Sequence, residues 1–143
     1  MVSRSYGIKV CDSAAYITVS ARSLIVCAPI LPDGSAGQIE PVWREVLGDD
    51  FAFGESGSLY VTTHPAQTLV CIDPSGKRTT IAGPDQGMVG ATACAFGIAP
   101  GDKEALYVST DGGFIVPYND VLQDAKLVRL ELGESGYPLL GQR

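Results

Sequence analysis

Three stretches of this sequence read alike: AAYITVS at residues 14–20, SLYVTTH at residues 58–64 and ALYVSTD at residues 105–111. Each is centred on a tyrosine, and the steps between the tyrosines are 44 and 47 residues. A period of about 40–50 residues, built from short alternating runs, is typical of β-propeller blades, each of which is a four-stranded antiparallel sheet. The repeat therefore predicts an all-β protein made of propeller blades.

The repeat extends to both sides of each tyrosine segment. Alternating runs precede the tyrosines at residues 7–12, 50–56 and 92–98, and others follow them at residues 23–30, 67–76 and 125–136. Weaker runs at residues 42–47 and 78–83 predict fourth strands, and residues 137–143 are a doubtful third copy. We expect one partial propeller domain over residues 1–143, with about three blades near residues 6–47, 49–83 and 91–143. A plain antiparallel sandwich is the alternative.

Composition limits the partners that this chain can bind. The net charge is −6, so we expect no nucleic-acid partner, because no basic stripe is available for phosphates. No apolar run approaches the roughly 20 residues that cross a bilayer, so we expect no membrane association. None of the four cysteines belongs to a C-x-x-C pair. Reduced thiols and a cytoplasmic location are the expectation.

Propeller geometry predicts which polar side chains gather at one end of the blades. The first strand of each blade lines the central axis, and aligning these strands makes Tyr6, Asp49 and Thr92 equivalent. Loops after the second strands bring His64 and Asp111 to the same face. We predict Asp49, His64 and Tyr6 as hydrogen-bonding or proton-transfer groups. The alternatives are a turn-capping role for Asp49 and an ordinary loop position for His64.

An insertion in the third blade points to the same face. Tyr60 and Val70 are 10 residues apart, whereas Tyr107 and Val128 are 21 apart. A one-sided insertion in a repeat array often marks the binding face, as a lid would. The predicted substrate pocket is lined by Phe51, Thr92, Cys94, Asp111, Phe114 and Tyr118. For Cys94, a place in the core is the alternative.

Residues 48–77 (GDDFAFGESGSLYVTTHPAQTLVCIDPSGK) and 91–113 (ATACAFGIAPGDKEALYVSTDGG) resemble the later blades of the senescence marker protein/gluconolactonase superfamily. The resemblance implies a six-bladed propeller, of which this chain matches the C-terminal half. Many members hydrolyse lactones with one divalent metal. Asp49 matches the aspartate that holds the metal, but the position of the family's asparagine ligand is Tyr6 here. Tyrosine is a poor ligand for a hard divalent ion.

Three functions follow from these observations. The first is a small-molecule pocket, without cofactor, that promotes a cyclisation or another rearrangement of an apolar substrate in a biosynthetic pathway. The second is a lactone or ester hydrolase dependent on Ca, Mg or Zn, with Asp49 as a ligand and the remaining ligands from a partner half. The third is a non-catalytic interaction scaffold. The expected partners are a small organic substrate and either a second copy of the chain or a missing N-terminal half-propeller.

Overall fold

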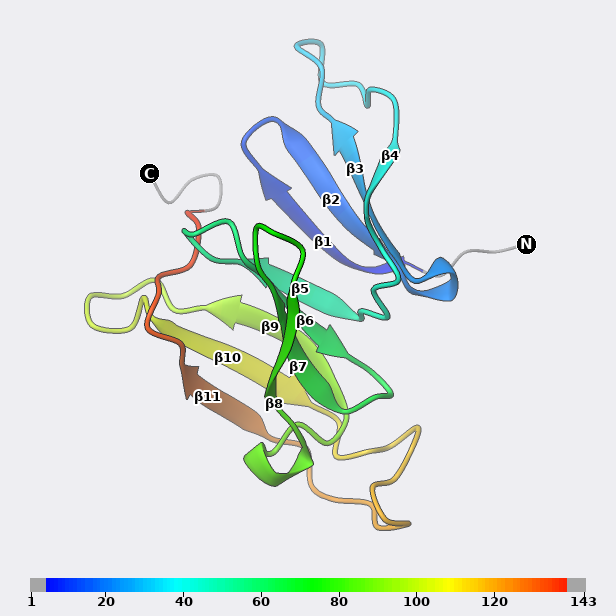
Figure 1. The fold of residues 1–143 in the computed structure, drawn as a ribbon, viewed down its shortest axis with the longest axis vertical. Helices are drawn as coiled ribbons and strands as arrows, with labels where there is room; N and C mark the ends of the chain where they lie inside the picture. Colours follow the sequence, from blue (N-terminus) through cyan, green and yellow to red (C-terminus); the bar gives the residue numbers. More distant parts are fainter. Residues whose placement is uncertain (1–4, 139–143) are drawn as a thin grey trace.

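The computed structural model describes residues 5–138, which form three antiparallel sheets fanned side by side (Figure 1). Blade one contains β1 (Ser5–Cys11), β2 (Ala14–Val19), β3 (Leu24–Pro29) and β4 (Glu40–Arg44). Blade two contains β5 (Asp50–Phe53), β6 (Leu59–Thr63), β7 (Thr68–Ile72) and β8 (Arg78–Ala82). Blade three contains β9 (Ala91–Phe96), β10 (Ala105–Thr110) and β11 (Leu127–Glu131). Two short 3-10 turns, η1 (Ser20–Arg22) and η2 (Pro84–Gln86), are the helical elements of the described residues. The predicted all-β fold of propeller blades is confirmed.

The blades share one register. Tyr16, Tyr60 and Tyr107 pair across the first two strands of their blades with Lys9, Ala52 and Ala95. The same tyrosines pair on their other side with Cys27, Cys71 and Arg129. Because side chains alternate between the two faces of a strand, this register also decides which residues of each blade face the next blade.

The third blade has three strands among the described residues, and the chain then leaves it. Gly136 forms an antiparallel bridge with Gly54 of blade two, and the Tyr137 amide donates to the Phe53 carbonyl at 2.8 Å. The described start of the doubtful fourth strand therefore pairs with blade two and not with β11. Glu134 explains the departure, because its carboxylate accepts from the Tyr60 hydroxyl and, at 3.1 Å, from the Ser56 amide. Residues 139–143 lie outside the described part.

The core consists of two apolar layers, one between each pair of blades. The layer between blades one and two is formed by Ile25, Val46, Phe51, Leu59, Val61 and Ile72. The layer between blades two and three includes Tyr60, Leu69, Met88, Cys94, Leu106 and Val108. Each sheet thus buries apolar side chains against its neighbour, which is the main source of stability in stacked sheets.

Two threonine hydroxyls join neighbouring blades next to the axis. The Thr18 hydroxyl accepts from the Gly7 amide of its own blade at 2.8 Å and donates to the Asp49 carbonyl of blade two at 2.9 Å. The Thr62 hydroxyl repeats this one blade further, between the Asp50 amide and the Thr92 carbonyl, both at 3.1 Å. Both threonines are fully buried. If a hydroxyl were removed, water could not reach the backbone groups to replace it.

Removing the Thr62 hydroxyl tests this link. Valine keeps the shape of threonine but leaves the Asp50 amide and the Thr92 carbonyl without this partner. We expect Thr62→Val to lower the free energy of unfolding by about 1–3 kcal/mol, because buried polar groups are then unsatisfied. Urea denaturation measures this loss. Thr80→Val, at an exposed position of β8, is the matched control. Equal midpoints for the two variants would show that the hydroxyl does not hold the blades together.

Candidate functional site

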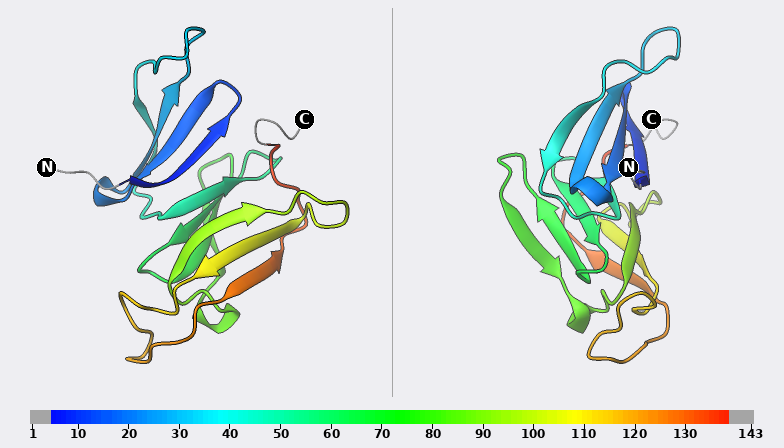
Figure 2. Two further views of the ribbon diagram at one scale, coloured as in Figure 1. Left: turned by 180° about the vertical axis from the view of Figure 1, so that it is seen from behind. Right: turned by 90° about the vertical axis from the view of Figure 1, so that its right-hand side faces the viewer.

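Three strand starts and three connections meet at one end of the blades. The inner strands β1, β5 and β9 run in the same direction, and their starts lie at this end together with the turns that follow β2, β6 and β10 (Figure 2). A hollow of about 410 Å³ opens there between the blades. It is lined by Tyr6, Gly7, Ile8, Lys9, Asp49, Asp50, Thr92 and Ala93. The equivalent residues Tyr6, Asp49 and Thr92 therefore share one hollow.

Backbone irregularities place two of these residues at the mouth. In β1, one extra residue lies between the pairs Ser5–Val19 and Ile8–Ile17. In β9, Thr92 is the extra residue between the pairs of Ala91 and Ala93 with β10. An extra residue of this kind bends the strand and re-aims a side chain, which is why such bulges recur beside functional sites. Tyr6 is 57% exposed, so its ring is open to solvent at this mouth.

The Asp49 carboxylate is partly buried and lies near the Asp50 and Asp111 carboxylates. Burial, the largest cause, raises the pKa of Asp49 above its usual 3.8, and the Asp50 and Asp111 carboxylates raise it further. His64 opposes them and lowers the pKa. A carboxyl group with a raised pKa exchanges its proton more readily near neutral pH, which is the property that general acid–base chemistry needs.

His64 and Asp111 form a pair on the same face. The His64 Nε2 atom lies 3.2 Å from the Asp111 Oδ2 atom, and the two side chains are 11% and 26% exposed. The other oxygen of Asp111 accepts from the Gly113 amide at 2.8 Å and the Phe114 amide at 3.1 Å. Asp111 therefore orients the imidazole and also fixes the start of the inserted loop.

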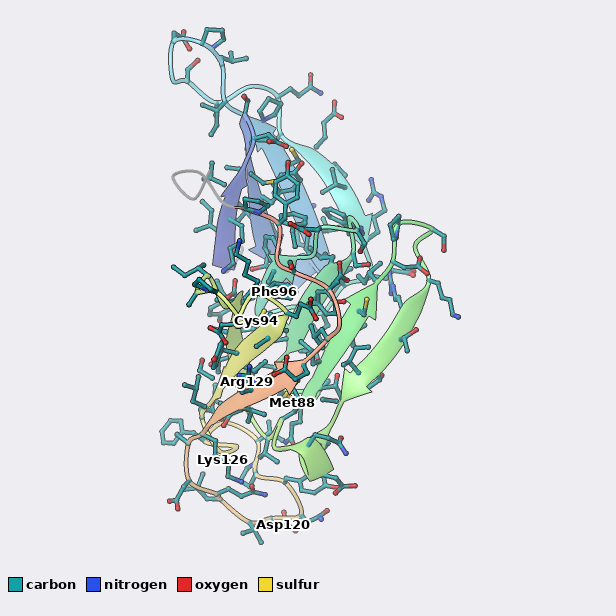
Figure 3. All side chains as sticks on the ribbon, turned by 90° about the vertical axis from the view of Figure 1, so that its left-hand side faces the viewer. Met88, Cys94, Phe96, Asp120, Lys126 and Arg129 are labelled. Carbon is teal, nitrogen blue, oxygen red and sulfur yellow. The ribbon has the colours of Figure 1, made fainter. Side chains whose placement is uncertain are left out.

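The inserted loop, residues 112–124, projects from this face and carries exposed apolar side chains. Phe114 is 77% exposed and Ile115 is 68% exposed, while Asp120 lies at the far tip of the loop (Figure 3). The Gln67 Nε2 atom donates to the Val116 carbonyl at 2.8 Å, which ties the loop to the turn that contains His64. Gln67 is 7% exposed, and its Oε1 atom is buried without a hydrogen-bond partner.

Some predicted pocket residues lie elsewhere, and this corrects the sequence-based picture. Phe51 is fully buried in the layer between blades one and two, and Cys94 is 4% exposed in the layer between blades two and three. Both side chains face a neighbouring blade and pack in the core instead of at the hollow. Phe114 points into solvent, and Tyr118 is bridged to Val121 within the inserted loop. Neither of these two aromatic residues lines the hollow.

Asp50 is the residue that the sequence reasoning missed. Both of its carboxylate oxygens accept from the Lys9 ammonium, at 2.8 and 2.9 Å, and one also accepts from the Cys94 amide at 3.2 Å. Asp50, whose side chain is 11% exposed, thus joins all three blades. The signal was the pair of adjacent aspartates at the start of a strand, because alternation turns neighbouring side chains to opposite faces.

The described residues do not by themselves supply a full set of side-chain ligands for a metal ion. Within residues 5–138, no three side chains of His, Cys, Asp or Glu converge in a way that could hold an ion. Both oxygens of Asp50 are occupied by Lys9, which leaves Asp49 as the carboxylate open to the hollow. A hard divalent ion such as Ca²⁺ or Mg²⁺ needs several oxygen ligands.

Comparison with known proteins shows the fold. No family model matches the chain, and no curated protein matches it. A solved structure of a luciferin-regenerating enzyme superposes on 95% of this chain with a TM-score of 0.71 and 20% identity, over 48% of its own length. Virginiamycin B lyase from Staphylococcus aureus superposes on 91% with a TM-score of 0.49 and 20% identity, over 42% of its length. At this identity the first likeness shows that the chain has a β-propeller fold.

The chain spans about half the length of the luciferin-regenerating enzyme structure, of which it covers 48%. This agrees with the expectation that it corresponds to half of a propeller. A search of the described residues for helices long and apolar enough to span a membrane finds none.

The raised pKa of Asp49 predicts how stability depends on pH. The folded state keeps the Asp49 proton to a higher pH than the unfolded chain, whose value is near 3.8. The stability that this proton contributes is therefore present below that value and is lost as pH rises through the folded pKa. Asparagine resembles the neutral acid. We expect Asp49→Asn to unfold at a higher urea concentration than the natural protein at pH 7, and at the same concentration at pH 3.

The control for this measurement is Asp124→Asn, at an exposed position of the inserted loop. It should leave the urea midpoint unchanged at both pH values. A lower midpoint for Asp49→Asn at pH 7 would mean that attraction between the Asp49 carboxylate and His64 outweighs the cost of burying the charge.

Proposed function

We propose that the hollow binds a small organic molecule and that Asp49, assisted by His64, transfers a proton to or from it. One observation carries this proposal: a carboxyl group with a raised pKa lies at the hollow, within electrostatic reach of an oriented histidine–aspartate pair. Perturbed carboxyl groups in a cleft beside a second titratable group are typical of acid–base sites. The propeller fold supplies the scaffold that holds these groups in place.

The chemistry proposed for the site needs only this chain's side chains. Asp49 gives up or accepts the proton. Asp111 holds the Nε2 atom of His64, so the Nδ1 atom of the ring faces away from the Asp111 carboxylate. Tyr6 offers a hydroxyl and an aromatic face at the mouth. A substrate held in one reactive conformer by these walls would need a single proton transfer to cyclise or rearrange. We place this activity in the cytoplasm, where the free thiols of Cys27, Cys71 and Cys94 stay reduced.

The metal-free character of the site belongs to the same proposal, and the donor set supports it. A lactone or ester hydrolase that uses a divalent ion would have to draw most of its ligands from outside residues 5–138. Elemental analysis of the purified chain distinguishes the metal-free site from the metal-dependent hydrolase. Stoichiometric calcium, magnesium or zinc would transfer support to the hydrolase.

Ligand binding tests the proposal directly. Native mass spectrometry of the purified chain should reveal a co-purified organic molecule, and Nile red, a neutral apolar dye, should bind with increased fluorescence. We expect Tyr6→Ala to weaken dye binding about tenfold, which corresponds to losing a contact worth about 1.4 kcal/mol. Tyr118→Ala, in the inserted loop and away from the hollow, should bind the dye as the natural protein does. Equal affinities for both variants, with no co-purified molecule, would favour the interaction scaffold.

A further inference from the structure

Contact between blades depends on a second repeated device besides the threonine hydroxyl. The Tyr16 ring of blade one meets Phe53 of blade two edge to face, with ring centroids 5.0 Å apart. The Tyr60 ring of blade two meets Phe96 of blade three in the same way at 5.5 Å. Blades one and two each present a hydroxyl and a tyrosine ring to the next blade, which receives them with a carbonyl and an apolar side chain. Edge-to-face aromatic pairs add to area burial, so the repetition is energetically meaningful.

The face of blade three that is turned away from blade two carries a hydroxyl and a tyrosine ring at the positions that make these contacts in the other blades. We call it the presenting face. Ser109 stands where Thr62 does, and Tyr107 stands where Tyr60 does. Leu127 pairs with Ser109 as Leu69 pairs with Thr62. Leu69 is fully buried, whereas Leu127 is 72% exposed. This face is built for a neighbouring blade that residues 5–138 do not provide.

The face of blade one that is turned away from blade two carries the receiving half. Ile8 occupies the position of Phe51 and Cys94 in the register of the first two strands. Those two residues are 0% and 4% exposed, whereas Ile8 is 59% exposed. The equivalence of Tyr6 with Asp49 and Thr92 makes its carbonyl the counterpart of the two carbonyls that accept from Thr18 and Thr62.

The two end faces also match each other in size. Arg129 replaces the small Cys27 and Cys71 on the presenting face, and Figure 3 shows it on β11. On the receiving face, Val10 stands where the other blades have phenylalanine, and Ala15 stands where they have leucine. The large Arg129 side chain thus lies on the presenting face, and the smaller Val10 and Ala15 side chains leave room on the receiving face. Matched volume of this kind is expected of two surfaces that pack together.

We propose that a second copy of this chain covers both end faces, with blade three of each copy packed on blade one of the other. The Ser109 hydroxyl then donates to the partner's Tyr6 carbonyl, and the Tyr107 ring packs on the partner's Val10. A two-fold axis makes the two contacts identical and closes the ring. The chain covers 48% of the luciferin-regenerating enzyme structure, so two copies supply about that length. The hollow is then enclosed by both copies. The assembly does not depend on the chemistry proposed for Asp49.

Sedimentation velocity of the 143-residue chain at micromolar concentration tests the assembly. The natural chain should sediment at twice its mass of 15.0 kDa. Leu127→Asp and Ile8→Asp each place a charge at one end face, and each should sediment as a single chain. Leu122→Asp is the matched control, because Leu122 is 60% exposed but belongs to the inserted loop. It should remain a dimer. Ser109→Ala should weaken the dimer about tenfold, since each of two contacts loses one hydrogen bond.

Mixing the two charged variants makes the test specific. Leu127→Asp keeps an intact blade one, and Ile8→Asp keeps an intact blade three, so the mixture can form one natural contact. We expect dimers in the mixture, weaker than those of the natural chain, although neither variant dimerises alone. A variant that fails to fold could not give this recovery. The proposal is overturned if the natural chain sediments at 15.0 kDa, if both charged variants stay dimeric, or if the mixture shows no recovery.

Discussion

The structure depends on one carboxylate that three blades share. Asp50 binds the Lys9 ammonium of blade one with both oxygens and the Cys94 amide of blade three with one. The two ionic side chains are 20% and 11% exposed, so the charges are partly removed from water and depend on each other. Removing one partner of a well-buried pair costs about 3–5 kcal/mol, and the residual exposure here places this pair at the lower end. The relative positions of the three inner strands, and with them the hollow, rest on this contact.

The same contact separates the roles of two neighbouring aspartates. Asp50 is neutralised by Lys9, whereas Asp49, one residue earlier, has no such ion pair within residues 5–138 and lies near two other carboxylates. One side chain stabilises the array, and the other carries a charge that the fold tolerates at a cost. A carboxyl group with a raised pKa persists only where the surrounding structure holds it, and the shared ion pair next to it provides that support.

The repeat of Tyr16, Tyr60 and Tyr107 was sufficient to predict the strands of blades one and two, three strands of blade three, and the end of the blades where His64 and Asp49 lie. The period of the repeat reports a unit of structure, and strand direction then follows from antiparallel pairing. The side-chain contacts were less predictable. Phe51 and Cys94 lie in inner strands, and only the register shows that they face a neighbouring blade. The role of Asp50 depends on a lysine 41 positions away in the sequence, and no local pattern encodes that distance.

Gly7 shows that the three blades are not interchangeable units. A Cβ atom at this position would lie 2.5 Å from the Oδ1 atom of Asp50 and 2.9 Å from its Cα atom. Blade two has Asp50 at the position that Gly7 occupies in blade one, according to the pairing with Thr62 and Thr18. A recombination event that copied blade two into the place of blade one would therefore set a carboxylate against a carboxylate where a glycine now leaves room. An exact copy of blade two would thus not fit at this contact in the place of blade one.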